Sequence, residues 1–187
     1  MLRPLLLALL FALPVTSGCD ALTPRTPEAP AGAATFVQPD TPETVLANLI
    51  ASLRERSPST YRRSLAPSLT YIPSREAASR DGFWQTWSAP EEEAYFRTLT
   101  SAAQPGATFS LSLATTTPSE VTADAFVLDT DYVLITPHNR AEAPTTVRGR
   151  LRWRIERAPD GLWSLTDWTD EATDGPTWSD LKAAFFQ

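Results

Sequence analysis

One segment late in the chain alternates strictly between arginine and residues that are apolar or small. Every even position from 148 to 154 is arginine, and the odd positions are Val147, Gly149, Leu151, Trp153 and Ile155. Successive side chains of a β-strand point to opposite faces. The pattern therefore predicts a strand with one face in a core and a row of four arginines on the other, which requires a sheet that is buried on one side.

The arginine row fits two interpretations: a site for phosphate or nucleic acid, or the solvent face of a sheet with acids beside it. Segment 121–135 can pair with the row through a hairpin that turns near residues 140–141. In that register Asp129 and Asp131 lie opposite the arginines at 152 and 150. Because the same register also satisfies the apolar face, we predict ion pairs worth about 0.2–1 kcal/mol each, and no metal at Asp129-x-Asp131. The apolar partners are Phe126, Leu128, Tyr132 and Leu134 against Ile155, Trp153, Gly149 and Val147.

Period-two alternation also predicts strands at residues 109–113, 121–135 and 162–169. The last of these follows a turn at residues 158–161, Ala-Pro-Asp-Gly. Trp163 and Leu165 should then face the core, and we expect Asp167 to continue that face. Trp168 should point the other way, within stacking reach of the arginines.

The first half of the chain predicts helices. Thr41 as N-cap, Pro42 and an apolar stripe predict a helix over residues 42–56. A short helix restarts at residues 57–59, and Ser88 with Glu91 forms a capping box for a third. A brief strand is expected at 69–72, residues 75–87 carry no assignable pattern, and a final helix follows Thr177 with Trp178, Leu181, Phe185 and Phe186.

This order of elements resembles the NTF2-like superfamily, an α+β cone with N-terminal helices packed on a curved antiparallel sheet. The resemblance covers about residues 41–169 and rests on the first helix, segment 61–72 (YRRSLAPSLTYI), a further helix and the strands that end in 161–168 (GLWSLTDW). A short C-terminal helix is an addition to the minimal cone. Members include ketosteroid isomerases, SnoaL-like cyclases, dehydratases, transport factors and domains without chemistry, so the resemblance implies a fold more strongly than a function.

The N-terminus carries a leader with Arg3, an apolar run over residues 5–13, and the small residues 16–18 before Cys19. The apolar run is shorter than the roughly 20 residues of a transmembrane helix. The leader resembles that of a bacterial lipoprotein precursor, and the alternative is an ordinary secretory signal. The resemblance implies that residues 1–18 are a signal peptide and that Cys19, the only cysteine, becomes the first residue and carries diacylglycerol, with a further acyl chain such as palmitate on its amine.

Lipid on Cys19 would anchor the chain in the bacterial cell envelope. Asp20 resembles the signal that retains enterobacterial lipoproteins on the inner membrane, but without a known host the choice between inner and outer membrane stays open. Residues 19–40 are rich in alanine and proline and predict a disordered tether that reaches at most about 70 Å. Residues 41–187 suit one domain with its own core.

Composition excludes several classes of function. A net charge of −6 argues against binding to nucleic acid or anionic headgroups. One cysteine cannot form an intramolecular disulfide. The sequence holds no glycine-rich phosphate loop, nucleophile elbow or HExxH motif, so no cofactor is expected. His138, the only histidine, falls in an expected hairpin loop without a second ligand nearby, and no metal site is expected.

Asp167 is the candidate catalytic residue, because a carboxylate on an apolar face has its pKa raised and suits general-base work. Tyrosines at 61, 71 and 132 could donate to a developing oxyanion. The candidate ligand-binding residues are Tyr61, Tyr71, Trp84, Trp87, Tyr132, Trp153 and Trp163.

Two functions stay open. In the first, the domain is a non-catalytic envelope module that binds a small apolar ligand or a protein partner near the membrane. In the second, it is a ketosteroid-isomerase-like or SnoaL-like acid-base enzyme that uses Asp167. They differ in whether Asp167 and a tyrosine meet in an open cavity or tryptophans fill the cone. The sheet face with the arginines and Trp168 could also form a homodimer interface.

Overall fold

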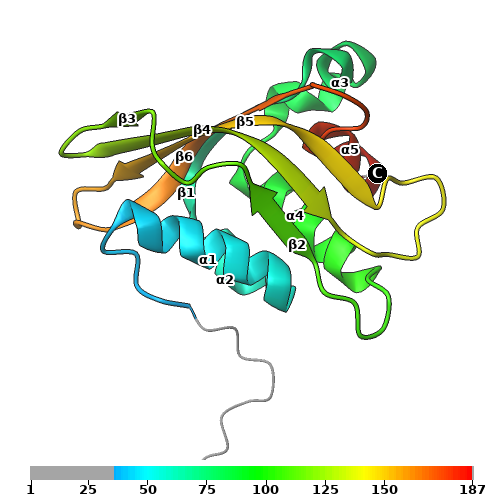
Figure 1. The fold of residues 1–187 in the computed structure, drawn as a ribbon, viewed down its shortest axis with the longest axis horizontal. Helices are drawn as coiled ribbons and strands as arrows, with labels where there is room; N and C mark the ends of the chain where they lie inside the picture. The colour runs from blue at the N-terminus through cyan, green and yellow to red at the C-terminus, as the bar shows by residue number, and fades with distance from the viewer. Residues whose placement is uncertain (1–35, 187) are drawn as a thin grey trace, which may run out of the picture. The chain divides into compact units, whose positions relative to one another are not determined.

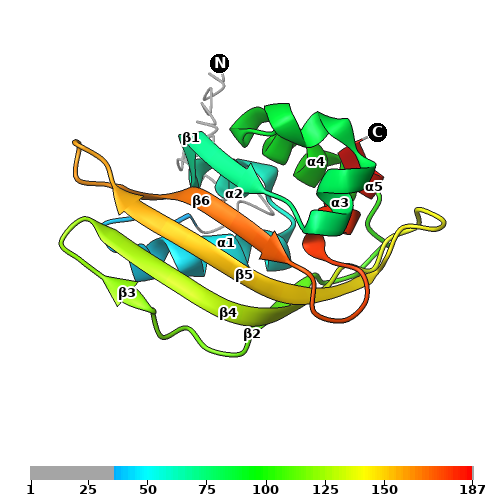
Figure 2. The same cartoon turned by 90° about the horizontal axis from the view of Figure 1, so that it is seen from above.

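A curved mixed sheet forms one layer of the protein and helices form the other (Figure 1). The computed structural model describes residues 36–186, so the predicted signal peptide, Cys19 and most of the predicted tether lie outside the described residues. The strand order is β1-β6-β5-β4-β2, with β3 beside β4 (Figure 2). The strands are β1 (Leu65–Ile72), β2 (Ser110–Leu113), β3 (Glu120–Val121), β4 (Ala125–Ile135), β5 (Thr146–Arg157) and β6 (Trp163–Glu171).

The helices begin where the capping signals predict. The side chain of Thr41 accepts a hydrogen bond from the backbone N–H of Thr44, and Ser88 with Glu91 forms the expected capping box. Residues 75–87, which carry no assignable pattern, form a short helix and a 3-10 turn. The helical elements are α1 (Pro42–Glu55), α2 (Pro58–Arg63), α3 (Arg75–Arg80), η1 (Gly82–Thr86), α4 (Ala89–Ser101) and α5 (Trp178–Phe186).

The hairpin of β4 and β5 has the predicted register. Asp131 pairs with Arg150, and Asp129 pairs with Arg152 across the strands. The ion pairs are partly diagonal, because the Arg150 guanidinium lies 2.6 Å from Asp129 and 3.5 Å from Asp131. The arginine row therefore lies on the outer face of the sheet, as predicted. The sheet is mixed rather than wholly antiparallel, since β1 runs parallel to β6.

A bulge in β6 reverses the expected orientation of its second half. Arg154 pairs with Asp167 and Ile155 pairs with Leu165, so Thr166 is an extra residue in the ladder. An extra residue exchanges the two faces of all that follows. Trp168 is fully buried in the core, and the half-buried Asp167 lies on the outer face opposite Arg154. The predicted orientations of Asp167 and Trp168 are both wrong.

Residues 36–40 are bound to the domain rather than free in the tether. The Asn48 side chain accepts from the Val37 N–H at 3.1 Å and donates to the Val37 carbonyl at 2.7 Å. The Pro39 carbonyl accepts from the backbone N–H of Trp163. The Arg63 guanidinium lies 3.6 Å from the centre of the Phe36 ring. Within the described part of the chain, no helix is long and apolar enough to cross a membrane.

Candidate functional site

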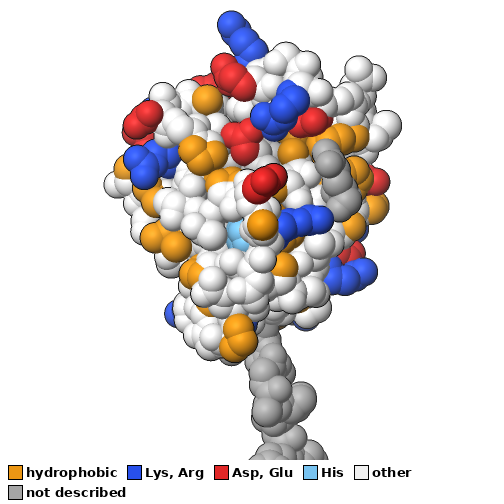
Figure 3. All heavy atoms as spheres, turned by 90° about the vertical axis from the view of Figure 1, so that its right-hand side faces the viewer, with side chains coloured by type: hydrophobic (Ala, Val, Ile, Leu, Met, Phe, Trp, Pro, Cys, Tyr) orange, Lys and Arg blue, Asp and Glu red, His pale blue; other side chains and the backbone are white. Residues whose placement is uncertain are grey.

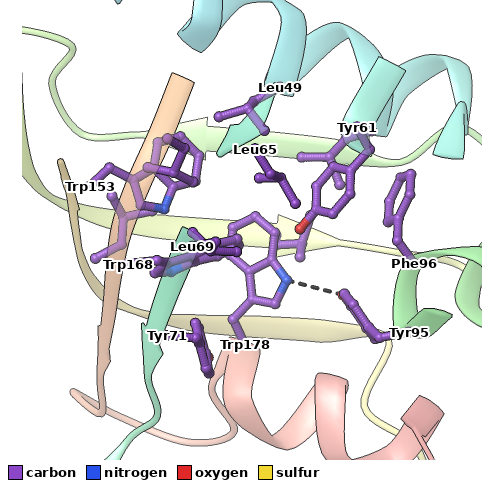
Figure 4. Close-up of a cluster of buried hydrophobic side chains, with 14 of the residues drawn as sticks. Leu49, Tyr61, Leu65, Leu69, Tyr71, Tyr95, Phe96, Trp153, Trp168 and Trp178 are labelled. Atoms are coloured by element: carbon purple, nitrogen blue, oxygen red, sulfur yellow. Dashed lines mark hydrogen bonds between the residues drawn. The ribbon is translucent and has the colours of Figure 1, made fainter. Parts of the chain in front are cut away.

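Helix α5 occupies the inside of the cone, between the sheet and α4. It contacts α4, β5 and α3. Trp178, its first residue, lies at the centre of a cluster of aromatic and aliphatic side chains from both layers (Figure 4). Its indole N–H donates to the Tyr95 hydroxyl at 3.0 Å, and its backbone N–H donates to the Tyr132 hydroxyl at 2.7 Å. The ring stands edge-on to Trp168, with 4.6 Å between centroids.

A buried carboxylate, Asp170, fixes the start of α5. Its Oδ2 accepts from the backbone N–H of Ser179 at 2.7 Å and from the Ser179 hydroxyl at 2.5 Å. Its Oδ1 accepts from the Tyr132 hydroxyl at 2.7 Å. Burial, and then the charge of Asp170, raise the pKa values of Tyr71 and Tyr132. Both phenols therefore remain protonated.

Glu92 of α4 is a second buried carboxylate on the opposite wall. Its Oε1 accepts from the Tyr61 hydroxyl at 2.6 Å, and its Oε2 accepts from the Trp87 indole N–H at 2.6 Å. The same Oε2 lies 2.8 Å from Lys182 Nζ, and neither side chain of this ion pair is exposed. Burial and then Glu92 raise the pKa of Tyr61, which keeps this hydroxyl a donor.

The Lys182 ammonium lies in a cage of aromatic rings. Its Nζ is 3.4 Å from the centroid of Tyr71 and 3.5 Å from that of Trp168. Trp87 and Tyr95 stand farther off, at 5.9 and 6.0 Å. Burial lowers the pKa of Lys182 to about 8, against the opposing effects of Glu92 and then Asp170. We call Tyr71, Trp87, Tyr95, Trp168 and Glu92 the ammonium cage.

The buried side chains inside the cone are of the types that acid-base enzymes use. Each of them is already hydrogen-bonded or ion-paired within the protein. Asp170 accepts at both oxygens, and Glu92 is surrounded by a phenol, an indole and an ammonium. A general base needs a free lone pair that a substrate proton can reach. Helix α5 packs against both carboxylates and supplies Ser179 to Asp170 and Lys182 to Glu92. The arrangement therefore positions α5.

Most of the predicted ligand-binding residues meet inside the cone. Tyr61, Tyr71, Trp84, Trp87, Tyr132 and Trp153 belong to one buried cluster with α5. Gly149 leaves room for Tyr132, since a Cβ there would lie 3.1 Å from its ring and 2.4 Å from the Glu171 carbonyl. Trp163, 8 % exposed, sits at the rim, beside an open surface hollow of about 620 Å³ that Phe36 and Arg63 also line. Asp167 lies apart from all of them, on the outer face.

Sequence reasoning missed Glu92, Asp170, Ser179 and Lys182. A signal for Glu92 was present, because it precedes Tyr95, Phe96 and Leu99 at helical spacing and so shares their buried stripe. Lys182 likewise follows Trp178 by four positions. Asp170 could not be found in this way, because the bulge that turns it inward leaves no mark in the alternation.

His138 is buried in the hairpin between β4 and β5. Its Nδ1 accepts from the Arg140 N–H, so its Nε2 carries the proton and donates to the Pro144 carbonyl at 3.2 Å. Its ring stands edge-on to Phe185 of α5. Among residues 36–186, no three histidine, cysteine or acidic side chains gather as they would around a metal ion.

Comparison with known proteins addresses the fold. No family model matches the sequence, and no curated protein does. Solved structures do match: an NTF2-like superfamily protein from Salmonella enterica has 16 % identity and a TM-score of 0.50, covering 70 % of this chain and 89 % of its own. The chain has the NTF2-like fold. Its N-terminal helices, curved sheet and short C-terminal helix are as predicted.

Other structures with this fold carry different names. A proposed aromatic ring hydroxylase from Novosphingobium aromaticivorans has 9 % identity and a TM-score of 0.55, covering 74 % of this chain and 92 % of its own. A proposed scytalone dehydratase from the same species has 10 % identity and a TM-score of 0.55, covering 71 % and 81 %. At these identities the likeness extends to the NTF2-like fold and not to a reaction.

Lys182 makes stability depend on pH in a defined direction. Its pKa is about 8 in the fold and 10.5 in the unfolded chain, so between these values the unfolded chain binds more protons and stability rises with pH. Above about pH 10 the buried tyrosines lower the stability as pH rises, because their phenols ionise only in the unfolded chain. Urea unfolding should show stability rising by about 2–3 kcal/mol from pH 8 to 10 and then falling. Lys182→Met should abolish the rise, and a rise that persists in this variant would assign it to another group.

The two aspartates of β6 should respond very differently to the same substitution. Asp170→Asn places an amide against the donors of Ser179 and Tyr132, which should destabilise the fold by about 3–5 kcal/mol. Asp167→Asn changes only a half-buried side chain across the strands from Arg154, which is paired with Glu156, and should cost less than about 1 kcal/mol. Urea midpoints of the two variants check this, and equal losses would contradict the bulge.

Proposed function

We propose that this chain is a cell-envelope lipoprotein, anchored through lipid on Cys19, whose NTF2-like domain is a non-catalytic binding module. The observation that carries the non-catalytic assignment is the filled cone, in which α5 covers Asp170 and Glu92 and supplies their partners. The anchor rests on the sequence alone, with the only cysteine placed after a short apolar leader. A lipid anchor suits a domain that must bind its ligand or partner close to a membrane.

The alternative, an acid-base enzyme that uses Asp167, loses its structural support. That hypothesis needed Asp167 on the core face beside a tyrosine. In the structure the bulge leaves Asp167 half-buried on the outer face, across from Arg154. Two similar structures are proposed enzymes, but the buried carboxylates of this chain are bonded to α5 and to the phenols and indole around it.

Two of the accessible surfaces in the described part of the chain are candidates for a small apolar ligand or a protein partner. One is the hollow between residues 36–39 and Trp163, where apolar rings meet the arginines of α2. The other is the outer face of the sheet, where Val133 and Ile135 are exposed beside the arginine row. On the face that Figure 3 shows, acidic and basic side chains are interspersed and hydrophobic ones scattered. That pattern suits a polar partner better than a membrane surface.

Removal of the cysteine tests the anchor. The Cys19→Ala chain, expressed in a Gram-negative host, should move from the membrane fraction to the soluble fraction and lose incorporation of radiolabelled palmitate. Without the thiol there is no site for the acyl chains that hold it. Ser17→Ala, which keeps a small residue before the cysteine, is the matched control and should stay membrane-bound. A Cys19→Ala chain that remains in the membrane fraction refutes the lipid anchor.

We also propose that the outer sheet face forms a homodimer. Arg148 and Arg152 have no acidic ion-pair partner among the described residues, and Val133 lies directly across from Arg148. Sedimentation of the Cys19→Ala chain should show a dimer that Val133→Lys converts to a monomer, because the new cation faces Arg148 and would be buried unpaired. Val121→Lys, at an exposed site on β3, is the control and should stay dimeric. A monomer before any surface substitution, at high concentration, excludes the interface.

A further inference from the structure

Lys182 is the only lysine in the chain, and it is completely buried. The other fifteen of the 16 basic residues are arginines. A lysine ammonium is compact and strongly hydrated, whereas arginine suits exposed and bidentate pairing. The single lysine side chain therefore lies in the ammonium cage, and none of its surface is exposed to water.

The cage has the composition of a site that recognises an ammonium ion. Two rings, Tyr71 and Trp168, lie within 3.5 Å of the nitrogen, and a carboxylate, Glu92, lies at 2.8 Å. Aromatic faces attract cations through the ring quadrupole, most strongly when both are desolvated. These five groups belong to β1, η1 and its flank, α4 and β6, so the cage is built by the cone and only its occupant belongs to α5.

A lysine at position 182 is not expected if α5 is only a permanent part of the hydrophobic core. A buried ion pair is often no more stabilising than apolar side chains of the same volume, because both charges must leave water. The depressed pKa of Lys182 reflects that penalty. An apolar residue at 182 would continue the stripe of Trp178, Leu181 and Phe185 without it. Compared with an apolar residue, the lysine weakens the packing of α5 against the cone, while its ammonium group fits the ammonium cage.

Helix α5 is joined to β6 by an exposed segment. Residues 172–176 are exposed, and Gly175 adopts a positive φ of 83°. The polar contacts of α5 run along its length, from Ser179 with Asp170 through Asp180 with Arg80 to Lys182 with Glu92. A ligand that takes the place of Lys182 would therefore remove one of several polar contacts that hold the helix.

We propose that the ammonium cage is a binding site for an alkylammonium group, which Lys182 occupies in the docked state, so that an amine-bearing ligand competes with α5 for the cone. The inference deepens the proposal that the domain is a binding module and depends on it. The ligand class follows from the cage: a cation with a short aliphatic stem, as Lys182 itself has. Its apparent affinity is reduced by the fraction of molecules with α5 undocked.

The first test removes the built-in occupant and supplies it from solution. In the full chain with Lys182→Ala, n-propylammonium at pH 7 should raise the Tm by several degrees, since it fills the vacated space and pairs Glu92. Neutral 1-propanol should not. Lys182→Met fills the same space without charge, so its Tm should not respond to either compound. No stabilisation of Lys182→Ala by n-propylammonium overturns the site.

The second test asks whether a ligand competes with α5 in the unaltered chain. Hydrogen exchange of the α5 amides should accelerate as n-propylammonium is added, while the amides of β4 and β5 stay protected. Potassium chloride at equal ionic strength is the control. Rescue of Lys182→Ala without faster exchange in the unaltered chain overturns the competition, because Lys182 is then a purely structural cation.

A second variant guards against a Lys182→Ala chain that does not fold. Glu92→Gln combined with Lys182→Ala removes the unpaired charge and keeps all four rings, so n-propylammonium should still raise the Tm, by less than in the single variant. No response to n-propylammonium there also overturns the site. These results are separable from the proposed function, because Cys19→Ala fractionation does not depend on the cage, and turnover of a substrate would refute the binding module without any amine.

Discussion

The ion pair between Lys182 and Glu92 is the constraint on which the interior depends. Two charges with no exposed surface are tolerated only if each finds partners. Glu92 therefore requires the phenol of Tyr61 and the indole of Trp87, and Lys182 requires the faces of Tyr71 and Trp168. Removing one member of such a pair typically costs about 3–5 kcal/mol. The position of α5 and the placement of these rings are tied to the ion pair, whereas the tyrosines stay protonated mainly because they are buried.

This constraint changes how the polar groups of the cone are understood. Carboxylates, tyrosines and a lysine with a lowered pKa are the materials of acid-base catalysis, and perturbed pKa values often mark active sites. Here the same perturbations arise from burial around a docked helix. Asp170 and Glu92 hold α5 through Ser179 and Lys182, so the packing of the helix accounts for both carboxylates.

Much of the fold was predictable because it follows from local rules. Capping residues set the starts of α1 and α4, and alternation with opposed charges set the β4–β5 register to the residue. The burial of the aromatic residues inside the cone was also predictable, since large apolar side chains on core faces pack away from water. Asp167 was misplaced because alternation assumes an unbroken ladder. One extra residue at Thr166 exchanged it with Trp168 and brought Asp170 inside.

The sequence by itself determined the elements, their caps, the hairpin register and the NTF2-like order, because these depend on residues close in the chain or on simple periodicity. It also marked Cys19 as the expected anchor. Only the tertiary structure decided that α5 enters the cone and that Lys182 meets Glu92, 90 positions away in the printed sequence. Such a meeting depends on desolvation and on contacts among several elements at once. Neither spacing nor composition carries that information, so a lone lysine in an apolar helix gave no sign of its cage.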